Sequence, residues 1–392
     1  MAKKPNRPTS EQFTLYHLQA SHAGQTLSAA LKGLLPETSW GQVTNWIARR
    51  HVQVNGNLCL DPARRVNATD VIKLWREPLP KPVAAEQLRL PYIDEHLVVV
   101  EKPAGITSVW HREERKLPAR RRRLQPTLEE LLPGAITKAI GPPRDLRAGN
   151  RFTSSGRVGQ GRRKPGAAEL RWPIFPVHRL DRDTSGLMLF ARTRIAEQKL
   201  VVMFRDHRID RQYWAVAAGQ VTSQTIRSIL IRDRGDGLRG SLEGSTRLSP
   251  LSQAPVSVQP SEAEKAAIEK SAGQLAVTHV ELRETIGEYS LVRCRLETGR
   301  THQIRIHLSE QGHPLCGEKT YTRLASGQDL VEPLAAPRQA LHAERLAFTH
   351  PLTGERLDLK MPLPNDLKHW LSRLRDSTES GRAPIPEQSD EN

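Results

Sequence analysis

Residues 177–191 read Val-His-Arg-Leu-Asp-Arg-Asp-Thr-Ser-Gly-Leu-Met-Leu-Phe-Ala. The first half is polar and dense in charge, and Thr184-Ser185-Gly186 closes it as a turn. The apolar run that follows is typical of a buried strand, because it is short, continuous and bounded by a turn. The pattern predicts a loop that a core strand holds rigidly, with Asp181 presented between two arginines.

A second dense stretch, residues 296–308, reads Leu-Glu-Thr-Gly-Arg-Thr-His-Gln-Ile-Arg-Ile-His-Leu. We expect it to enter a helix with Thr301 as the N-cap residue. On that helix Arg305 lies one position away from the buried stripe of Ile304 and Leu308. An arginine so close to an apolar stripe is costly unless a carboxylate pairs with it, so the sequence predicts an acidic partner.

The chain of 392 residues is strongly basic, with 59 Lys and Arg against 43 Asp and Glu and a formal net charge of +16. This excess favours a polyanionic partner, because each neutralised phosphate releases condensed counterions, although a solvated basic surface is an alternative. Cys59, Cys294 and Cys316 form no CxxC pair, which fits a reducing cytoplasm and indicates neither disulfides nor a zinc site. No apolar run approaches the roughly 20 residues of a membrane span, so we expect no membrane association.

Composition and periodicity divide the chain into a small and a large domain. We expect a polar arm over 1–12, a small domain over 13–77, a Pro-rich linker over 78–89, a large domain over 90–375 and a disordered acidic tail over 376–392. We also expect two insertions in the large domain, a basic one over 111–172 with a short helix near Thr127–Leu132 and a polar one over 233–273.

The small domain combines two amphipathic helices with short strands. The helical faces are set by Leu27, Leu31, Leu34 and Leu35, and then by Val43, Trp46 and Ile47. An alternating strand over 52–54 follows and ends in an Asn55-Gly56 turn. The arrangement resembles the S-four-type RNA-binding domain, which implies a small α/β fold, although Thr26-Leu27-Ser28 stands where that family usually carries Arg-Leu-Asp. A helix-hairpin that only packs on the next domain is the alternative.

The large domain carries five motifs that resemble those of the RluA-type pseudouridine synthases, in the family's order. They are Lys102 to Gly105, His178 to Leu187, Arg211-x-Tyr213-x-Ala215, Thr298 to His307, and the pair Leu341-His342-Ala343 and His350-Pro351. The resemblance covers about Leu90 to Pro364 apart from the two insertions. It implies a mixed α+β fold, with a curved, antiparallel-rich sheet flanked by helices and an active cleft that crosses it.

The resemblance implies an isomerase that detaches uracil from its ribose within RNA and re-attaches it through carbon 5. By this likeness Asp181 is the catalytic carboxylate, Arg305 is its ion-pair partner, and Tyr213 stacks on the base and serves in the proton transfer from carbon 5. The likeness gives substrate-binding roles to His178, Arg179, Thr184, Lys102, Arg300, His302 and Gln303. It implies no cofactor and no metal, and the histidines include no pair with the spacing of a helical zinc site.

These residue types suit that chemistry. A carboxylate can attack the anomeric carbon or remove a neighbouring sugar proton, and it must be ionised for either. A nearby arginine would favour the ionised form by roughly 1–3 pKa units. An aromatic platform holds a detached base by its face. A hydrolase would need a second carboxylate to activate water, for which Asp183 is the only nearby candidate, so the sequence favours isomerisation.

The expected partner is RNA, with large-subunit ribosomal RNA favoured over transfer RNA, and we expect a cytoplasmic monomer. The identity of the target uridine does not follow from the sequence. Two alternatives from other functional classes are a non-catalytic RNA-binding ribosome-assembly factor and a nucleoside hydrolase.

Overall fold

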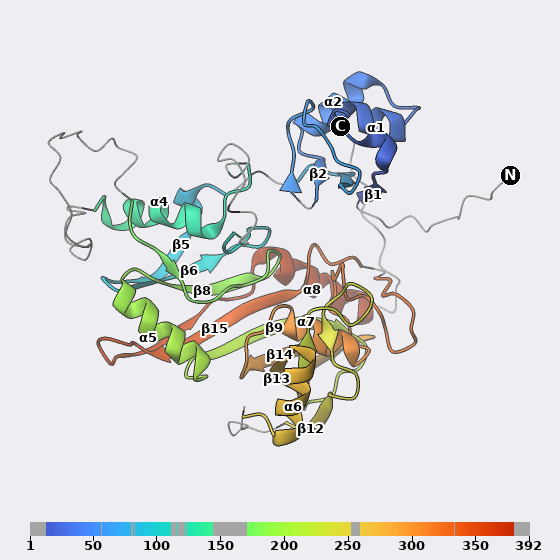
Figure 1. Ribbon diagram of the computed structural model, residues 1–392. Helices are drawn as coiled ribbons and strands as arrows, with labels where there is room; N and C mark the ends of the chain where they lie inside the picture. The colour runs from blue at the N-terminus through green and yellow to red at the C-terminus, as the bar shows by residue number, and fades with distance from the viewer. Residues whose placement is uncertain are drawn as a thin grey trace, which may run out of the picture. The chain divides into compact units, whose positions relative to one another are not determined.

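The computed structural model describes residues 13–379, apart from 56, 80, 82, 111–114, 116–121, 123, 144–170, 252–258 and 333. The chain forms two compact units (Figure 1), of which the first comprises Met1–Val83 and Trp110–Pro126 and the second Ala84–Val109 and Thr127–Asn392. The expected arm, most of the basic insertion, and residues 380–392 of the expected tail lie outside the described residues.

The first unit is a small antiparallel sheet that shares its core with two helices. The strands, in the order β1-β4-β2-β3, are β1 (Phe13–His17), β4 (Val71–Trp75), β2 (Val52–Val54) and β3 (Asn57–Leu58). The helices are α1 (Leu27–Leu34) and α2 (Trp40–Ala48), and the single-turn η1 (Ala20–His22) precedes them. Thr26 and Ser39 cap the two helices with their hydroxyl oxygens, which accept hydrogen bonds from the backbone N–H groups of Ala29 and Gln42. Buried side chains from both helices and from the sheet form one apolar core.

The second unit is built on a 12-stranded sheet in which all pairings are antiparallel except that of β15 with β8. Its main path runs β11 (Gly240–Ser241), β10 (Gln224–Ile231), β13 (Gln274–Ile286), β14 (Tyr289–Leu296), β9 (Asp210–Ala218), β15 (Leu341–Thr349), β8 (Ser185–Ala191), β6 (Leu97–Lys102) and β5 (Arg89–Ile93). Three further strands pair off this path, namely β12 (Arg247–Pro250), β16 (Arg356–Lys360) and β7 (Phe175–Pro176). The architecture is mixed α+β with an antiparallel-rich sheet, as the sequence predicted.

The helices of the second unit are η2 (Ala85–Gln87), α4 (Leu128–Ile140), α5 (Arg194–Arg205), α6 (Glu262–Ser271), α7 (Gln303–Glu310) and α8 (Asn365–Glu379). Two of them, α5 and α8, pack against the sheet through separate apolar clusters. Helix α5 packs on strands β6, β8 and β15, whereas α8 packs on β9, β13 and β14. Figure 1 shows α5, in green, running along the sheet beside β15. Among the described residues, no helix is both long and apolar enough to cross a membrane.

Three helix boundaries differ from the sequence predictions. Helix α4 continues beyond Leu132 and through Pro133, because Thr127 and Glu130 form a capping box and the buried side chains continue to Ile136. Helix α8 extends to Glu379, so the first residues of the expected tail are helical.

The third difference concerns the helix that carries Arg305. Helix α7 begins at Gln303 rather than after a Thr301 cap, and its N-cap residue is His302 in a left-handed backbone conformation (φ 60°). The side chain of Gln303 organises this turn instead, because its Oε1 accepts a hydrogen bond from the backbone N–H of Arg300 at 3.0 Å.

Gly186 allows the charged loop to enter the sheet. It stands at the parallel junction of β8 and β15, paired with Ala343, and its φ is +129°. A Cβ atom on this residue would lie 2.3 Å from the carbonyl oxygen of Ala343. Only glycine fits both the backbone conformation and this close approach.

Replacing Gly186 by alanine should therefore destabilise the large unit. We expect a loss of about 3 kcal/mol or more in the free energy of unfolding, because the strain of a positive φ (about 1–2 kcal/mol) adds to the overpacking. Gly354→Ala is the matched control, since its φ is +78° but no atom lies within 4 Å of the new Cβ. Urea denaturation of both variants measures the difference, and equal losses would contradict the packing argument.

Candidate active site

A pocket of about 380 Å³ opens in the second unit where the charged loop, strand β9 and helix α7 meet. Nine of the ten residues that the sequence singled out line it, namely His178, Arg179, Asp181, Thr184, Tyr213, Arg300, His302, Gln303 and Arg305. The tenth, Lys102, does not. The pocket therefore joins motifs that lie more than a hundred residues apart in the sequence.

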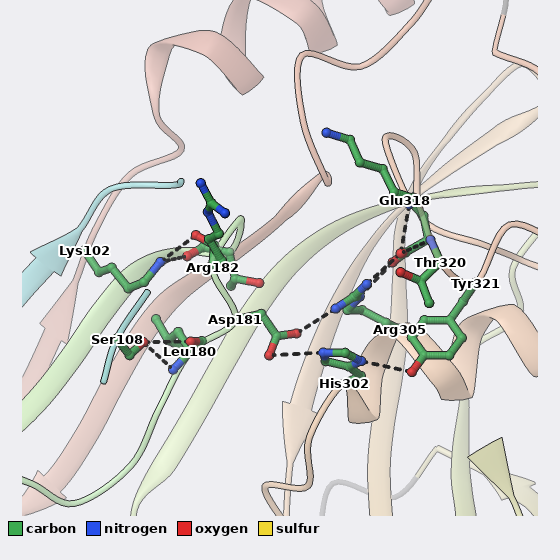
Figure 2. A network of polar contacts seen from close by, with 12 residues as sticks. Lys102, Ser108, Leu180, Asp181, Arg182, His302, Arg305, Glu318, Thr320 and Tyr321 are labelled. Carbon is green, nitrogen blue, oxygen red and sulfur yellow. Dashed lines mark hydrogen bonds and ion pairs between the residues drawn. The ribbon is translucent and has the colours of Figure 1, made fainter. Parts of the chain in front are cut away.

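Hydrogen bonds to its backbone hold the loop that carries Asp181 in place (Figure 2). The hydroxyl of Ser108 donates to the carbonyl oxygen of Leu180 at 2.7 Å and accepts from the Leu180 N–H at 3.1 Å. The backbone N–H of Gly105 donates to the carbonyl of Arg182 at 2.8 Å. The residues on both sides of Asp181 are thus held in place, and this positions its carboxylate.

Lys102 holds the loop rather than contacting the pocket. Its side chain is fully buried, and Nζ donates to the carbonyl oxygens of Pro103, Arg182 and Thr184 at 3.1, 2.9 and 2.7 Å. Burial lowers the pKa of Lys102 to about 7, against the charges of Asp183 and Asp181, which raise it. The sequence prediction of a substrate-binding role is corrected accordingly, because these carbonyl groups occupy its hydrogen-bond donors.

The guanidinium of Arg305 is divided between two carboxylates, as Figure 2 shows. Nε and Nη2 donate to Oε2 and Oε1 of Glu318, both at 2.7 Å, in a bidentate pair. Nη1 donates to Oδ2 of Asp181 at 3.2 Å. Glu318 therefore fixes the plane of the guanidinium, and Asp181 receives a single N–H from it.

The surroundings keep both members of the bidentate pair charged. Burial would lower the pKa of Arg305, but hydrogen bonds and charge from Glu318, together with the charge of Asp181, raise it above its ordinary value. Burial would likewise raise the pKa of Glu318, but Arg305 lowers it below its usual range. The backbone N–H groups of Lys319 and Thr320 also donate to Glu318 Oε1, each at 2.9 Å.

His302 and Tyr321 lie beside this ion-pair system. The imidazole Nε2 of His302 is 3.9 Å from Asp181 Oδ1, and its Nδ1 is 2.9 Å from the hydroxyl of Tyr321. The Tyr321 ring faces the guanidinium of Arg305 at 5.2 Å. The left-handed backbone of His302 costs about 1–3 kcal/mol, a cost often found at functional sites.

The remaining predicted residues divide into those available to a ligand and those engaged internally. Arg179 is exposed at the pocket, and Tyr213 lines it from β9 with its ring 6% exposed. Burial raises the pKa of the Tyr213 phenol, so it is neutral at neutral pH. The Thr184 hydroxyl lines the pocket with no hydrogen-bond partner among the described residues.

Two predicted binding residues use their polar atoms to hold the walls of the pocket. Gln303 accepts from Thr298 Oγ1 and the Arg300 N–H, and its Nε2 donates to Val277 O and Thr278 Oγ1. The Nε2 of His178 accepts the backbone N–H of Leu189 at 2.9 Å, and burial lowers the pKa of His178 to about 3. Both side chains are thus committed to the protein's own structure.

The sequence did not single out several residues of the site. Glu318 and Tyr321 lie in the loop after α7, and Phe204 and His207 line the pocket, as does Arg211, which the sequence placed in a motif without giving it a role. The sequence predicts an acidic partner for Arg305, and the family resemblance identifies Asp181 as that partner. A second carboxylate beside the same guanidinium is therefore not expected from the sequence.

Residues 96–310 match the RNA pseudouridylate synthase family. The chain belongs to this family. Curated relatives named ribosomal large subunit pseudouridine synthase D support this over most of the chain. The protein from Zymomonas mobilis is 32% identical over 365 residues, covering 92% of this chain and 96% of the relative. That from Pseudomonas aeruginosa is 33% identical over 366 residues, covering 91% and 94%.

As a pseudouridine synthase, the chain is an isomerase that converts uridine in RNA to pseudouridine. The pocket suits such an isomerase chemically, because it combines one carboxylate, a fixed guanidinium and a neutral phenol ring. Positively charged side chains around the mouth suit an anionic polymer.

Replacing Glu318 by glutamine should slow the reaction through Arg305. The amide can no longer accept both N–H groups of the guanidinium, so Arg305 loses its fixed plane and Asp181 its fixed partner. We expect the single-turnover rate of tritium release from [5-³H]uridine-labelled RNA to fall about 10²-fold. We also expect a loss of about 3 kcal/mol in stability, as for a broken buried ion pair.

Glu332→Gln is the matched control for this variant. Glu332 lies in the same loop and accepts from the backbone N–H groups of Gly317 and Ala336 at 2.6 and 3.0 Å. Its amide variant likewise loses one acceptor but leaves the contacts of Arg305 in place. Its rate should stay within a factor of about three of the wild type, as expected for a group outside the reaction. A Glu318→Gln enzyme as fast as the control would show that Glu318 does not position Arg305.

Proposed function

We propose that the chain converts specific uridines of large-subunit ribosomal RNA to pseudouridine, with Asp181 as the catalytic carboxylate. The observation that carries this proposal is the single pocket in which Asp181 is bonded to Arg305 and shares the walls with Tyr213. In this reaction the C1′–N1 bond of uridine breaks and a C1′–C5 bond forms, while the hydrogen of carbon 5 leaves as a proton and N1 takes up a proton.

Asp181 acts on the sugar in this scheme. Its carboxylate attacks C1′ or removes a neighbouring sugar proton, and either step requires the ionised form. Its side chain is 18% exposed, and Oδ2 is bonded to Arg305. The hydrogen bond from the fixed guanidinium of Arg305 orients this carboxylate in the pocket.

Tyr213 holds the detached base. Its ring lines the pocket from a strand of the central sheet, where it is held more rigidly than it would be in a loop. Stacking on a ring tolerates rotation of the base about its normal, which the exchange of N1 for C5 requires. The neutral phenol is also available to assist the departure of the proton from carbon 5.

The pocket favours isomerisation over hydrolysis. Of the described residues that line it, Asp181 alone carries a carboxylate, and Asp183 is not among them. Glu318 is bound through both oxygens to Arg305 and cannot readily serve as a base toward water. A hydrolase of the two-carboxylate type needs such a second base.

Large-subunit ribosomal RNA is proposed as the substrate because the relatives that match more than 90% of the chain carry it in their names. We propose that the first unit is an S-four-type RNA-binding domain, since its two capped helices and antiparallel strands suit that fold. The net charge of +16 supports binding to a polyanion. The enzyme would act as a monomer in the cytoplasm, where ribosomal RNA is modified.

The proposal is tested by tritium release from [5-³H]uridine-labelled large-subunit ribosomal RNA. Wild-type protein should release tritium to water, and Asp181→Asn should lose at least about 10³-fold in rate, since the amide can neither attack nor take up a proton. Thermal unfolding of the variant checks that the fold is intact.

The other possible outcomes would each support one of the alternative functions. Binding without tritium release from any RNA would indicate a non-catalytic RNA-binding protein. Free uracil in the reaction would indicate a hydrolase. Release from transfer RNA but not from ribosomal RNA would overturn the proposed substrate while retaining the chemistry.

A further inference from the structure

Two arginines and a histidine line the pocket in addition to the Arg305 system. Arg211 comes from strand β9, His207 from the turn between α5 and β9, and Arg300 from the segment before α7. The synthase chemistry of Asp181, Arg305 and Tyr213 makes no use of them. Their position in the same pocket calls for a separate explanation.

Arg211 is buried and lacks a counter-ion. It is 7% exposed, and its Nε is buried without an acceptor among the described residues. Its guanidinium lies 5.5 Å from the centre of the Phe204 ring, and it packs against Gly299, where an added Cβ would lie 2.4 Å from Nη1. The group is therefore fixed in place by packing while hydrogen-bonding capacity remains open.

The two carboxylates that act on Arg211 electrostatically are hydrogen-bonded to other arginines. Those of Glu297 and Asp210 act on its pKa from a distance. Glu297 accepts from Arg295 Nη1 at 2.6 Å, and Asp210 is bonded to Arg345. Burying a guanidinium without an anion is costly, so an anionic group from elsewhere would complete the site.

The two guanidinium groups of this cluster repel each other. Burial lowers the pKa of Arg300, and the charge of Arg211 lowers it further. For His207, burial lowers the pKa most, Glu297 raises it, and the charges of Arg211 and Arg300 lower it, so the imidazole is neutral at neutral pH and can donate a hydrogen bond. An anion between the two guanidinium groups would relieve their repulsion.

We propose that Arg211, with Arg300 and His207, forms a subsite for a phosphodiester of the RNA backbone next to the target uridine. This subsite rests on the proposed function, because it assumes that an RNA nucleotide enters the pocket. Arginine binds phosphate through two parallel hydrogen bonds, which suits a guanidinium fixed by packing.

The position of Arg211 on β9 supports this assignment. Side chains alternate between the faces of a strand, so Arg211 and Tyr213 point to the same side, about 7 Å apart along it. This separation is on the scale of one nucleotide, which places a phosphate at Arg211 when the base lies on Tyr213. While the base is detached, the subsite would keep the sugar within reach of Asp181.

The subsite is tested with full-length Arg211→Gln and Arg211→Lys enzymes on large-subunit ribosomal RNA. For Arg211→Gln we expect kcat/KM of tritium release to fall about ten- to a hundredfold, as for a lost hydrogen bond to a charged group. The slope of log association constant against log NaCl should become shallower by about 0.7–0.9, the value for one phosphate contact. Arg211→Lys keeps the charge, so it should retain the slope and lose less activity.

Arg192→Gln is the matched control, because Arg192 is 5% exposed, has an unpaired Nε and lies outside the pocket lining. It should keep the wild-type slope even where it lowers stability. An Arg211→Gln enzyme with the wild-type slope would overturn the subsite, whatever its activity.

Two further outcomes are distinguishable. If inorganic phosphate binds the wild type in a calorimeter while the RNA slope is indifferent to Arg211→Gln, the site holds a free anion, and the RNA assignment is wrong. If the wild type binds RNA but releases no tritium, the proposed function fails, and the binding slopes still decide on the subsite.

Discussion

The guanidinium of Arg305 is shared unequally between two carboxylates, and the geometry of the pocket depends on this division. Glu318 takes two N–H groups at 2.7 Å each, and Asp181 takes one at 3.2 Å. A buried arginine with one carboxylate could rotate toward it and neutralise it completely. Because Glu318 sets the plane of the guanidinium, the carboxylate of Asp181 keeps one oriented hydrogen-bond donor and leaves its other oxygen outside this hydrogen bond.

The rest of the unit brings that carboxylate to the guanidinium from a distant part of the sequence. Lys102 and Ser108 hold the backbone of the loop, and Gly186 lets the loop pass into β8 beside β15. Strand β9 supplies Tyr213 to the same pocket from the centre of the sheet. Each of these contacts is internal and buried, so the site is organised before any RNA binds, which reduces the reorganisation that catalysis would otherwise require.

Local patterns predicted the charged loop, the strand after it, the helix of Arg305 and an acidic partner for Arg305, and the family resemblance identified that partner as Asp181. They could not predict which hydrogen bonds form between distant segments of the chain. Lys102 belongs to a motif, yet its burial under the loop depends on three carbonyl groups that only the fold brings together. Glu318 stands in an irregular loop without periodicity, so its bidentate contact had no sequence signal of its own. Thr301 is a good capping residue by type, but the side chain of Gln303 organises that turn instead.

Glu318 acts on the reaction through Arg305, and a double-mutant cycle can measure whether it has any effect besides. Single-turnover tritium release would be measured for the wild type, Arg305→Lys, Glu318→Gln and the double variant. Lysine cannot donate the two parallel hydrogen bonds that Glu318 accepts from Arg305, so adding Glu318→Gln to Arg305→Lys should cost little or nothing further. If the fold-reductions in rate of the two single variants multiply in the double variant, Glu318 acts independently of Arg305, which would contradict its role as the group that positions Arg305.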